Sequence, residues 1–328
     1  MRRPSPSARL RPDPVVSGNP FAGEVADAVS ALNGVRSAWR ARRAEHRGLS
    51  RFPAPTELAR FIEHMAAALF PTRLGGFRGG IAREDDFVAE QLTRGFAILR
   101  AELAAEFDYW QLHVDSPFDT DQPDLLVRLF AAALPEIRIL LDEDVDAAFV
   151  GDPAARSVDE ILISYPGALA ILYYRIAHQL HGLGAVIVAR ILSELANART
   201  GIDIHPAATI GPSFFIDHGT GVVIGETTII GRNVRLYQHV TLGARSPLGL
   251  APAGPRSRYA RHPIIEDDVI IYAGATILGR VTIGHGSTIG GNVWLLDDVP
   301  PHSVLVQPAA VTLEGDAQSD MIARLENR

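Results

Sequence analysis

The chain of 328 residues carries 38 Asp and Glu against 31 Arg, contains neither Lys nor Cys, and has a formal net charge of −7. These counts exclude disulfides, thiolate metal ligands, cysteine acyl intermediates and lysine Schiff bases. The acidic balance argues against a nucleic-acid partner, and no apolar run reaches the roughly eighteen residues that a membrane span needs. We therefore expect a cytoplasmic protein with two domains and no membrane partner.

The N-terminal segment MRRPSPSARLRPDPVVSGNP is rich in Arg and Pro and lacks the apolar stretch of a signal peptide. Such a segment buries too little apolar surface to offset the entropy lost on ordering. We expect a disordered tail over residues 1–20.

The region over residues 21–200 has apolar residues at helical spacing. The clearest series is Val88, Leu92, Phe96, Leu99, Leu103, Phe107 and Trp110. An earlier helix is predicted with Thr56 as its N-cap, another is predicted to begin after Asp121, and a further pair is predicted to follow Pro166. The break at Gly182 separates the last two helices. The region is therefore predicted to be an α-helical domain.

After Gly201 the apolar spacing changes to six residues, a period that fits neither a helix nor a meander of strands. The repeat positions are Ile204, Ile210, Ile216, Ile224, Ile230, Leu236, Leu242, Ile265, Ile271, Ile277, Ile283, Ile289 and Leu295. A triangular prism of short strands, with one aliphatic residue per side pointing inward, accounts for this period. The predicted fold class is α+β, with a left-handed parallel β-helix over 201–307 and a C-terminal tail over 308–328.

The repeat is interrupted twice, and interruptions of a solenoid become loops on which sites are built. The first is a two-residue slip beside Asp217, His218 and Gly219. The second, over 244–262, is rich in Pro, Gly and Arg and is expected to protrude as a loop.

Six strings carry a resemblance to one known family. They are GDPAA at 151–155, YRIAHQL at 174–180, DIHPAATIG at 203–211, DHGTGVVIGE at 217–226, VTLGA at 240–244 and RHPIIEDDVIIYAGATILG at 261–279. The chain resembles the serine O-acetyltransferases, hexapeptide-repeat enzymes that make O-acetyl-L-serine from L-serine and acetyl-CoA in cysteine biosynthesis. The match covers roughly residues 150–306. It implies acetyl-CoA as co-substrate and no tightly bound cofactor.

Acyl transfer to an alcohol needs a base for the hydroxyl proton, and without Cys a histidine is the obvious candidate. His218 lies at the slip of the repeat, so we expect it on a displaced loop. Asp203 comes fifteen residues earlier, close to one coil, and the two are expected to be stacked neighbours. A carboxylate there can orient the imidazole. The resemblance likewise assigns His218 and Asp203 as the catalytic pair.

Serine also presents a carboxylate and an ammonium group. Arg261 can bind the carboxylate with two hydrogen bonds, and His262 can add a donor. Asp217 and Asp152 match the serine-binding positions of the family and are expected to take the ammonium group. Asp152 would then reach the site from the helical domain.

The resemblance places acetyl-CoA in a groove between adjacent subunits of a homotrimer, with a dimer of trimers as a further possible assembly. The expected backbone contacts are at Gly243, Ala244, Ala273 and Gly274. The tail ends in Arg328 instead of the Ile that docks into cysteine synthase in many members, so the resemblance does not extend to that complex.

Three other readings compete with this one. A hexapeptide acyltransferase for homoserine or an amino sugar would share the repeat, but an amino sugar has no carboxylate for Arg261. A non-catalytic β-helix assembly module would not need His218 and Asp203. A zinc site of the γ-class carbonic anhydrase type would need a close histidine pair, whereas the histidines of the repeat lie 13 or more residues apart. We therefore expect no metal.

Overall fold

The structure is a computed structural model that describes residues 19–42, 51–111, 121–245 and 259–308. The chain separates into one unit at Met1–Leu49 and another at Ser50–Arg328. The first unit contains helix α1 (Ala22–Arg42), which sequence reasoning did not identify. The expected tails and most of the expected protruding loop lie outside the described residues, and the predicted domain boundaries stay predictions.

Helices dominate the second unit up to Thr200. They are α2 (Pro55–Leu69), the short η1 (Ile81–Arg83), α3 (Glu84–Gln111), α4 (Gln122–Gly151), α5 (Val158–Ser164), α6 (Pro166–Gly182) and α7 (Val186–Thr200). The apolar stripe predicted on α3 is confirmed, because Leu99, Leu103 and Phe107 are buried. The predicted cap at Thr56 is wrong: α2 begins at Pro55, whose fixed φ angle suits a first helical turn. None of the described helices combines the length and apolarity required to cross a bilayer.

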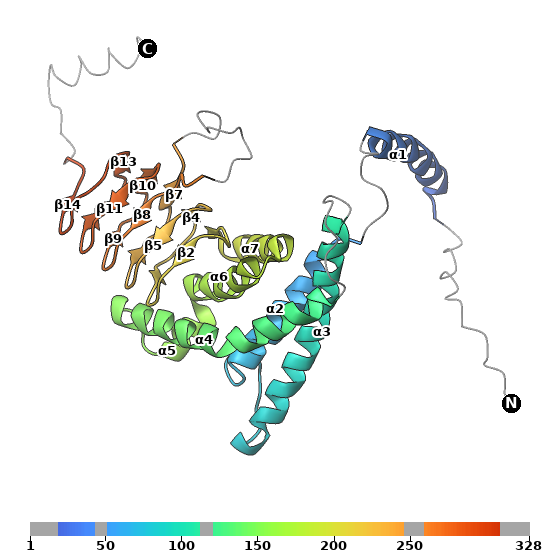
Figure 1. Ribbon diagram of the computed structural model, residues 1–328, viewed down its shortest axis with the longest axis horizontal. Coiled ribbons are helices and arrows are strands. Elements are labelled where there is room, and N and C mark those ends of the chain that lie inside the picture. Colours follow the sequence, from blue (N-terminus) through green and yellow to red (C-terminus); the bar gives the residue numbers. More distant parts are fainter. Residues whose placement is uncertain (1–18, 43–50, 112–120, 246–258, 309–328) are drawn as a thin grey trace, which may run out of the picture. The chain divides into compact units, whose positions relative to one another are not determined.

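From Asp203 onward the chain forms a left-handed parallel β-helix whose short strands stack rung upon rung (Figure 1). Its strands are β1 (Asp203–Ile204), β2 (Thr209–Ile210), β3 (Phe215–Ile216), β4 (Val223–Ile224), β5 (Ile229–Ile230), β6 (Arg235–Leu236), β7 (Thr241–Gly243), β8 (Ile264–Ile265), β9 (Ile270–Ile271), β10 (Thr276–Leu278), β11 (Thr282–Ile283), β12 (Thr288–Ile289), β13 (Trp294–Leu295) and β14 (Val304–Leu305). All thirteen predicted repeat positions are buried inside the prism. The predicted fold class is confirmed.

The strands form three sheets, which are the faces of the prism. Face A has the order β1-β4-β7-β10-β13, face B has β11-β8-β5-β2, and face C has β14-β12-β9-β6-β3. All the pairings are parallel. Because successive strands change face, each turn between them is a corner. Residues that follow a face C strand lie at the C/A corner, and residues that follow a face A strand lie at the A/B corner.

The helices hold the first coil of the prism through a buried ion pair. Arg175 on α6 donates to both carboxylate oxygens of Asp144 on α4 at 3.0 and 2.9 Å. The same guanidinium donates to the carbonyls of Ile210 and Gly211 at 2.6 and 2.7 Å, and Asp144 accepts from the Phe214 amide at 2.8 Å. Both charged side chains are almost fully buried. This network fixes α4 and α6 against the solenoid.

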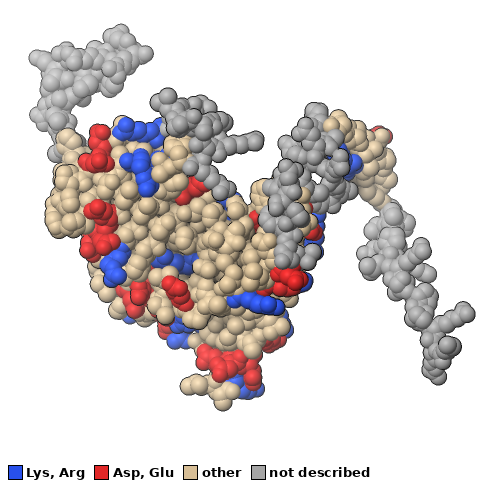
Figure 2. Space-filling view, in the orientation of Figure 1, with Lys and Arg blue, Asp and Glu red and all other residues tan. Residues whose placement is uncertain are grey.

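The start of α6 touches the solenoid directly. A Cβ atom on Gly167 would lie 2.2 Å from the carbonyl oxygen of Ile216, so only glycine permits this approach. The contact places the residues just before α6 beside the loop that follows β3. On the side of the molecule in Figure 2, acidic and basic side chains are interspersed and do not gather into a field of one sign.

Candidate active site

The loop that carries His218 departs from the regular corners of the solenoid. Six non-glycine residues with positive φ each lie two residues before a strand, namely Ser213, Asn233, His239, Asp268, Asn292 and His302. His218, with φ of 59°, is the exception, since it comes five residues before β4 on the two-residue slip. Its side chain is 70% exposed. The slip therefore displaces His218 from the repeat, as the sequence predicted, and its imidazole is accessible.

Asp152 reaches the same corner from the end of α4. Its Oδ2 accepts the Tyr165 hydroxyl at 2.6 Å, and its Oδ1 accepts the Ala154 amide at 2.8 Å. These two hydrogen bonds lower the pKa of Asp152, and the charges of Arg235 and His218 act in the same direction. The bond to Asp152 raises the pKa of Tyr165 to about 12, so Tyr165 keeps its proton and remains a donor. Asp152 is thus held as an oriented carboxylate.

Asp217 is held from the next coil. Arg235 on β6 donates from Nη2 to Asp217 Oδ2 at 2.7 Å, while Asp217 Oδ1 lies 3.8 Å from His218 Nδ1. The Asp217 amide donates to the Leu236 carbonyl at 2.8 Å. Asp152, Asp217 and His218 are thereby brought to one place, which we call the His218 corner and which includes Tyr165 and Arg235.

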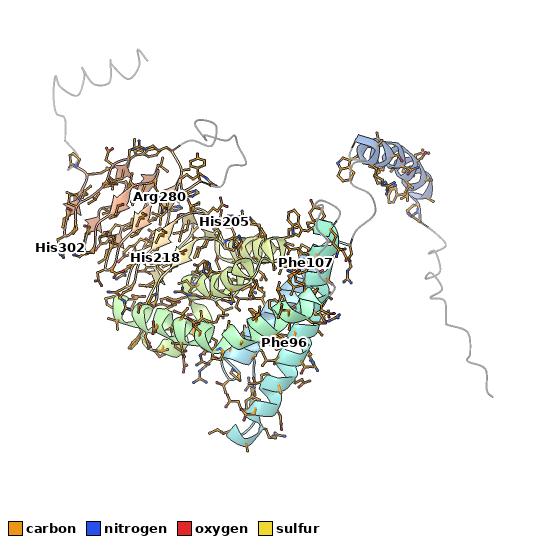
Figure 3. All side chains as sticks on the ribbon, viewed as in Figure 1. Phe96, Phe107, His205, His218, Arg280 and His302 are labelled. Carbon is orange, nitrogen blue, oxygen red and sulfur yellow. The ribbon has the colours of Figure 1, made fainter. Side chains whose placement is uncertain are left out.

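Arg261 and His262 lie elsewhere, at the A/B corner. Arg261 Nη2 donates to Glu226 Oε2 at 2.6 Å. Burial raises the pKa of Glu226, but the hydrogen bond and charge of Arg261 outweigh it, so that this pKa is lowered. We call this group, together with His205, the Arg261 corner. Figure 3 labels His205 of the Arg261 corner and His218 of the His218 corner.

His262 is buried with its tautomer set by its neighbours. The Thr227 amide donates to His262 Nδ1 at 3.1 Å, which leaves Nε2 as the N–H donor. Burial, with the Arg261 charge adding to it, lowers the pKa of His262 to about 4. The ring packs over Gly225, where a Cβ atom would lie 2.2 Å from Nε2. His262 therefore offers a neutral, rigid hydrogen-bond donor.

The pKa of His205 is lowered, as is that of His262. The Nδ1 atom of His205 accepts the Ala207 amide at 3.1 Å, as expected for a turn residue. Burial, followed by the charge of Arg190, lowers its pKa to about 4.

The structure corrects the expected stacking of Asp203 beneath His218. The register pairs Asp203 with Val223, because this coil holds twenty residues, eighteen for three repeats and two for the slip. His218 comes only fifteen residues after Asp203 and therefore lies at the C/A corner, short of a full coil. Among the described residues no hydrogen bond or ion pair joins Asp203 to His218. Burial raises the pKa of Asp203, the charge of Arg190 acts against this rise, and the charge of Glu194 adds to it. Since Arg190 also acts on His205, Asp203 belongs with the Arg261 corner.

The four positions expected to contact acetyl-CoA are divided between the A/B and C/A corners. Gly243 ends β7 on the A/B side, with Ala244 directly after it, and its carbonyl accepts the Gly279 amide at 2.9 Å. Ala273 and Gly274 lie at the C/A corner, where Gly274 has φ of 74°. A Cβ atom on Gly274 would lie 2.2 Å from Asn292 Oδ1. Their role stays a prediction.

Sequence reasoning missed Tyr165 and Arg235, which hold the two carboxylates of the His218 corner. Tyr165 directly precedes Pro166, and Arg235 directly precedes the buried repeat position Leu236, an outward position on face C. A stack of coils places Arg235 one coil above the segment of Asp217, and this adjacency was the available signal. Within the described parts of the chain, no group of three or more His, Asp or Glu is arranged to hold a metal ion.

Comparison with known proteins identifies close relatives of this fold and sequence. The family model described as bacterial transferase hexapeptide (six repeats) matches residues 262–297. The plasmid serine acetyltransferase of Synechococcus elongatus is 47% identical over 262 residues, which cover 78% of this chain and 82% of the relative.

Two solved structures agree with this match. Serine acetyltransferase isoform 3 of Entamoeba histolytica, in complex with cysteine, is 32% identical with a TM-score of 0.66 and covers 80% of this chain and 87% of its own. Soybean serine acetyltransferase, complexed with serine, is 32% identical with a TM-score of 0.50 and covers 79% of this chain and all of its own.

Proposed function

The chain belongs to the serine acetyltransferase family, and from this premise we propose how the His218 corner and the Arg261 corner carry out the reaction. The substrates are L-serine and acetyl-CoA, and the products are O-acetyl-L-serine and CoA. The proposal concerns the residues that perform this transfer and the assembly in which they meet.

His218 acts as the general base. Its neutral imidazole accepts the proton of the serine hydroxyl while the serine oxygen attacks the thioester carbon of acetyl-CoA. The bond from that carbon to sulfur then breaks, and the departing thiolate takes the proton back from His218. In this proposal the acetyl group passes directly to serine in a ternary complex, and the chain has no Cys or Lys to carry it in between.

The remaining groups bind the two charges of serine. Asp152 and Asp217 accept hydrogen bonds from the ammonium group beside His218. Arg261 and the Nε2–H of His262 bind the carboxylate, for which a neutral donor and a guanidinium are well suited. Asp203 of an adjacent copy orients the imidazole of His218, so that the other nitrogen of the ring is free to accept the proton.

The single observation that carries this proposal is the separation of these residues between two corners of one prism. Asp152, Asp217 and His218 lie at the C/A corner, whereas Arg261 and His262 lie at the A/B corner. One chain alone does not bring the base to the carboxylate-binding groups. We infer that the His218 corner of one copy meets the Arg261 corner, with Asp203, of an adjacent copy in a homotrimer.

The same arrangement supports the acetyl-CoA groove. Gly243 and Ala244 lie on the A/B side, and Ala273 and Gly274 lie at the C/A corner. Two adjacent copies would therefore line a groove with backbone from both sides. Small residues at these positions permit a pantetheine arm to approach the backbone closely.

Mixing two inactive variants tests the shared site. Chains with His218→Asn and chains with Arg261→Met are co-expressed with different tags, and assemblies that carry both tags are purified. If the site is shared, each trimer that carries both tags rebuilds one of its three sites, so the purified assemblies regain about a third of the wild-type sites. The measurement is serine-dependent release of CoA per assembly.

The matched control combines His218→Asn with Asp217→Asn, which both alter the His218 corner. This mixture rebuilds no intact site and is expected to show no more activity than its parents. Failure of the first mixture to exceed its parents would show that one chain supplies both groups.

A further inference from the structure

Arg235 contacts both segments that supply the ammonium-binding carboxylates. Its Nη2 donates to Asp217 Oδ2 at 2.7 Å, and its Nη1 donates to the Gly151 carbonyl at 2.5 Å. Gly151 ends α4 and is followed directly by Asp152. One guanidinium therefore joins the solenoid loop that carries Asp217 to the helix end that carries Asp152.

The side chain of Arg235 packs against two aromatic rings. Its Cζ lies 4.9 Å from the centre of the Phe215 ring and 4.6 Å from the centre of the Tyr237 ring. Only 20% of the side chain is exposed, and Asp217 is exposed by 10%. A cation that stacks on two rings and bonds to two acceptors has one available orientation. Arg235 is thus a rigid support, unlike a surface ion pair.

The backbone at the end of α4 packs closely against Phe215 and Arg235. A Cβ atom on Gly151 would lie 3.0 Å from the Phe215 ring and 3.5 Å from Arg235 Nη1. Asp152 is fixed independently by Tyr165 and by the Ala154 amide. Its distance from Asp217 therefore depends on how the end of α4 is held to face C, and Arg235 adds a local link there to the one that Arg175 makes.

The local charge also fits a single ammonium group. Asp152 and Asp217 bring two negative charges, and Arg235 contributes one positive charge. The sum of one negative charge matches one substrate ammonium, whereas two neighbouring carboxylates alone would repel each other.

We propose that Arg235 is a positioning residue for L-serine: it orients Asp217 and sets the separation of Asp217 from Asp152, so that both carboxylates meet one ammonium group. This inference rests on the proposed function. Arg235 does not touch the reacting atoms and acts through Asp217 and Asp152. Among the described residues, Arg235 forms no hydrogen bond or ion pair with Gly243, Ala244, Ala273 or Gly274, so we expect acetyl-CoA binding to depend on it little.

Steady-state kinetics of the full-length enzyme test this role. Arg235→Met is expected to raise the KM for L-serine by about tenfold to a hundredfold, the cost of a charged hydrogen-bond partner. The KM for acetyl-CoA is expected to change by less than about twofold. Arg235→Lys keeps the charge but not the paired donors, so its KM for serine is expected to lie between that of the wild type and that of Arg235→Met. Arg232→Met, at an exposed arginine on the same coil, is the matched control and leaves both constants unchanged.

A double-mutant cycle separates positioning from a general structural role. In an Asp217→Asn background, Arg235→Met should raise the KM for serine far less than it does in the wild type. Equal effects in both backgrounds, equal rises in both KM values, or an unchanged KM for serine would overturn the inference. If Arg235→Met does not fold, Arg235→Lys supplies the same comparison. Wild-type enzyme without serine-dependent CoA release would instead refute the proposed function.

Discussion

Replacing His218 with Asn lowers kcat for acetyl transfer to L-serine by about a hundredfold to ten-thousandfold, the usual contribution of a general base. Asn is the appropriate substitution because it tolerates the positive φ of this position. The fold is therefore preserved while the base is lost. The measurement is kcat from thiol release at saturating serine and acetyl-CoA, with the circular dichroism spectrum of the variant alongside.

His302→Asn is the matched control for this substitution. His302 also has a positive φ and is exposed, but it occupies a regular corner position on the last coil. We expect His302→Asn to keep wild-type kcat. A His218→Asn enzyme with more than about a tenth of wild-type kcat would remove His218 as the base.

Replacing Arg175 with Met lowers the free energy of unfolding by about 3–5 kcal/mol, the cost of breaking a buried ion pair on one side. The variant leaves Asp144 buried with only the Phe214 amide as a donor, and it frees the carbonyls of Ile210 and Gly211. Because these groups join α4 and α6 to the first coil, we expect the loss of stability where α4, which ends beside Asp152, packs on the solenoid. Urea denaturation followed by circular dichroism measures the change.

The double variant Arg175→Met with Asp144→Leu supplies the control. Removing both charges takes away the uncompensated carboxylate, so much of the lost stability is expected to return. If the single variant unfolds at the urea concentration of the wild type, the network does not hold the junction.

Much of the solenoid could be predicted because its signal is local. One inward aliphatic residue every six positions is a consequence of the prism, so the repeat alone identified its core from Ile204 to Leu295. The apolar series on α3 worked for the same reason, since its spacing follows the helical turn. The start of α2 was misplaced because Thr56 and Pro55 both favour a helix start, and Pro55 prevails.

The candidate site was predictable residue by residue but not in its arrangement. The family strings pointed to His218 and Asp203, yet their relation depends on register. A full coil from Asp203 reaches Val223, whereas His218 comes only fifteen residues after Asp203 and lies at another corner. Likewise, Arg235 carries no motif of its own. Its importance comes from contacts with Asp217 and Gly151, which lie 18 and 84 residues away along the chain. Such contacts depend on the fold and not on any local pattern.

The most direct test of the account is the dependence of CoA release on the acceptor. Purified protein is incubated with acetyl-CoA and L-serine, L-homoserine, glucosamine or no acceptor, and the free thiol and the acetylated product are both measured. The account predicts rapid thiol release with L-serine, matched one for one by O-acetyl-L-serine, and only slow release otherwise. Thiol release that is independent of L-serine, or faster with glucosamine, would contradict it.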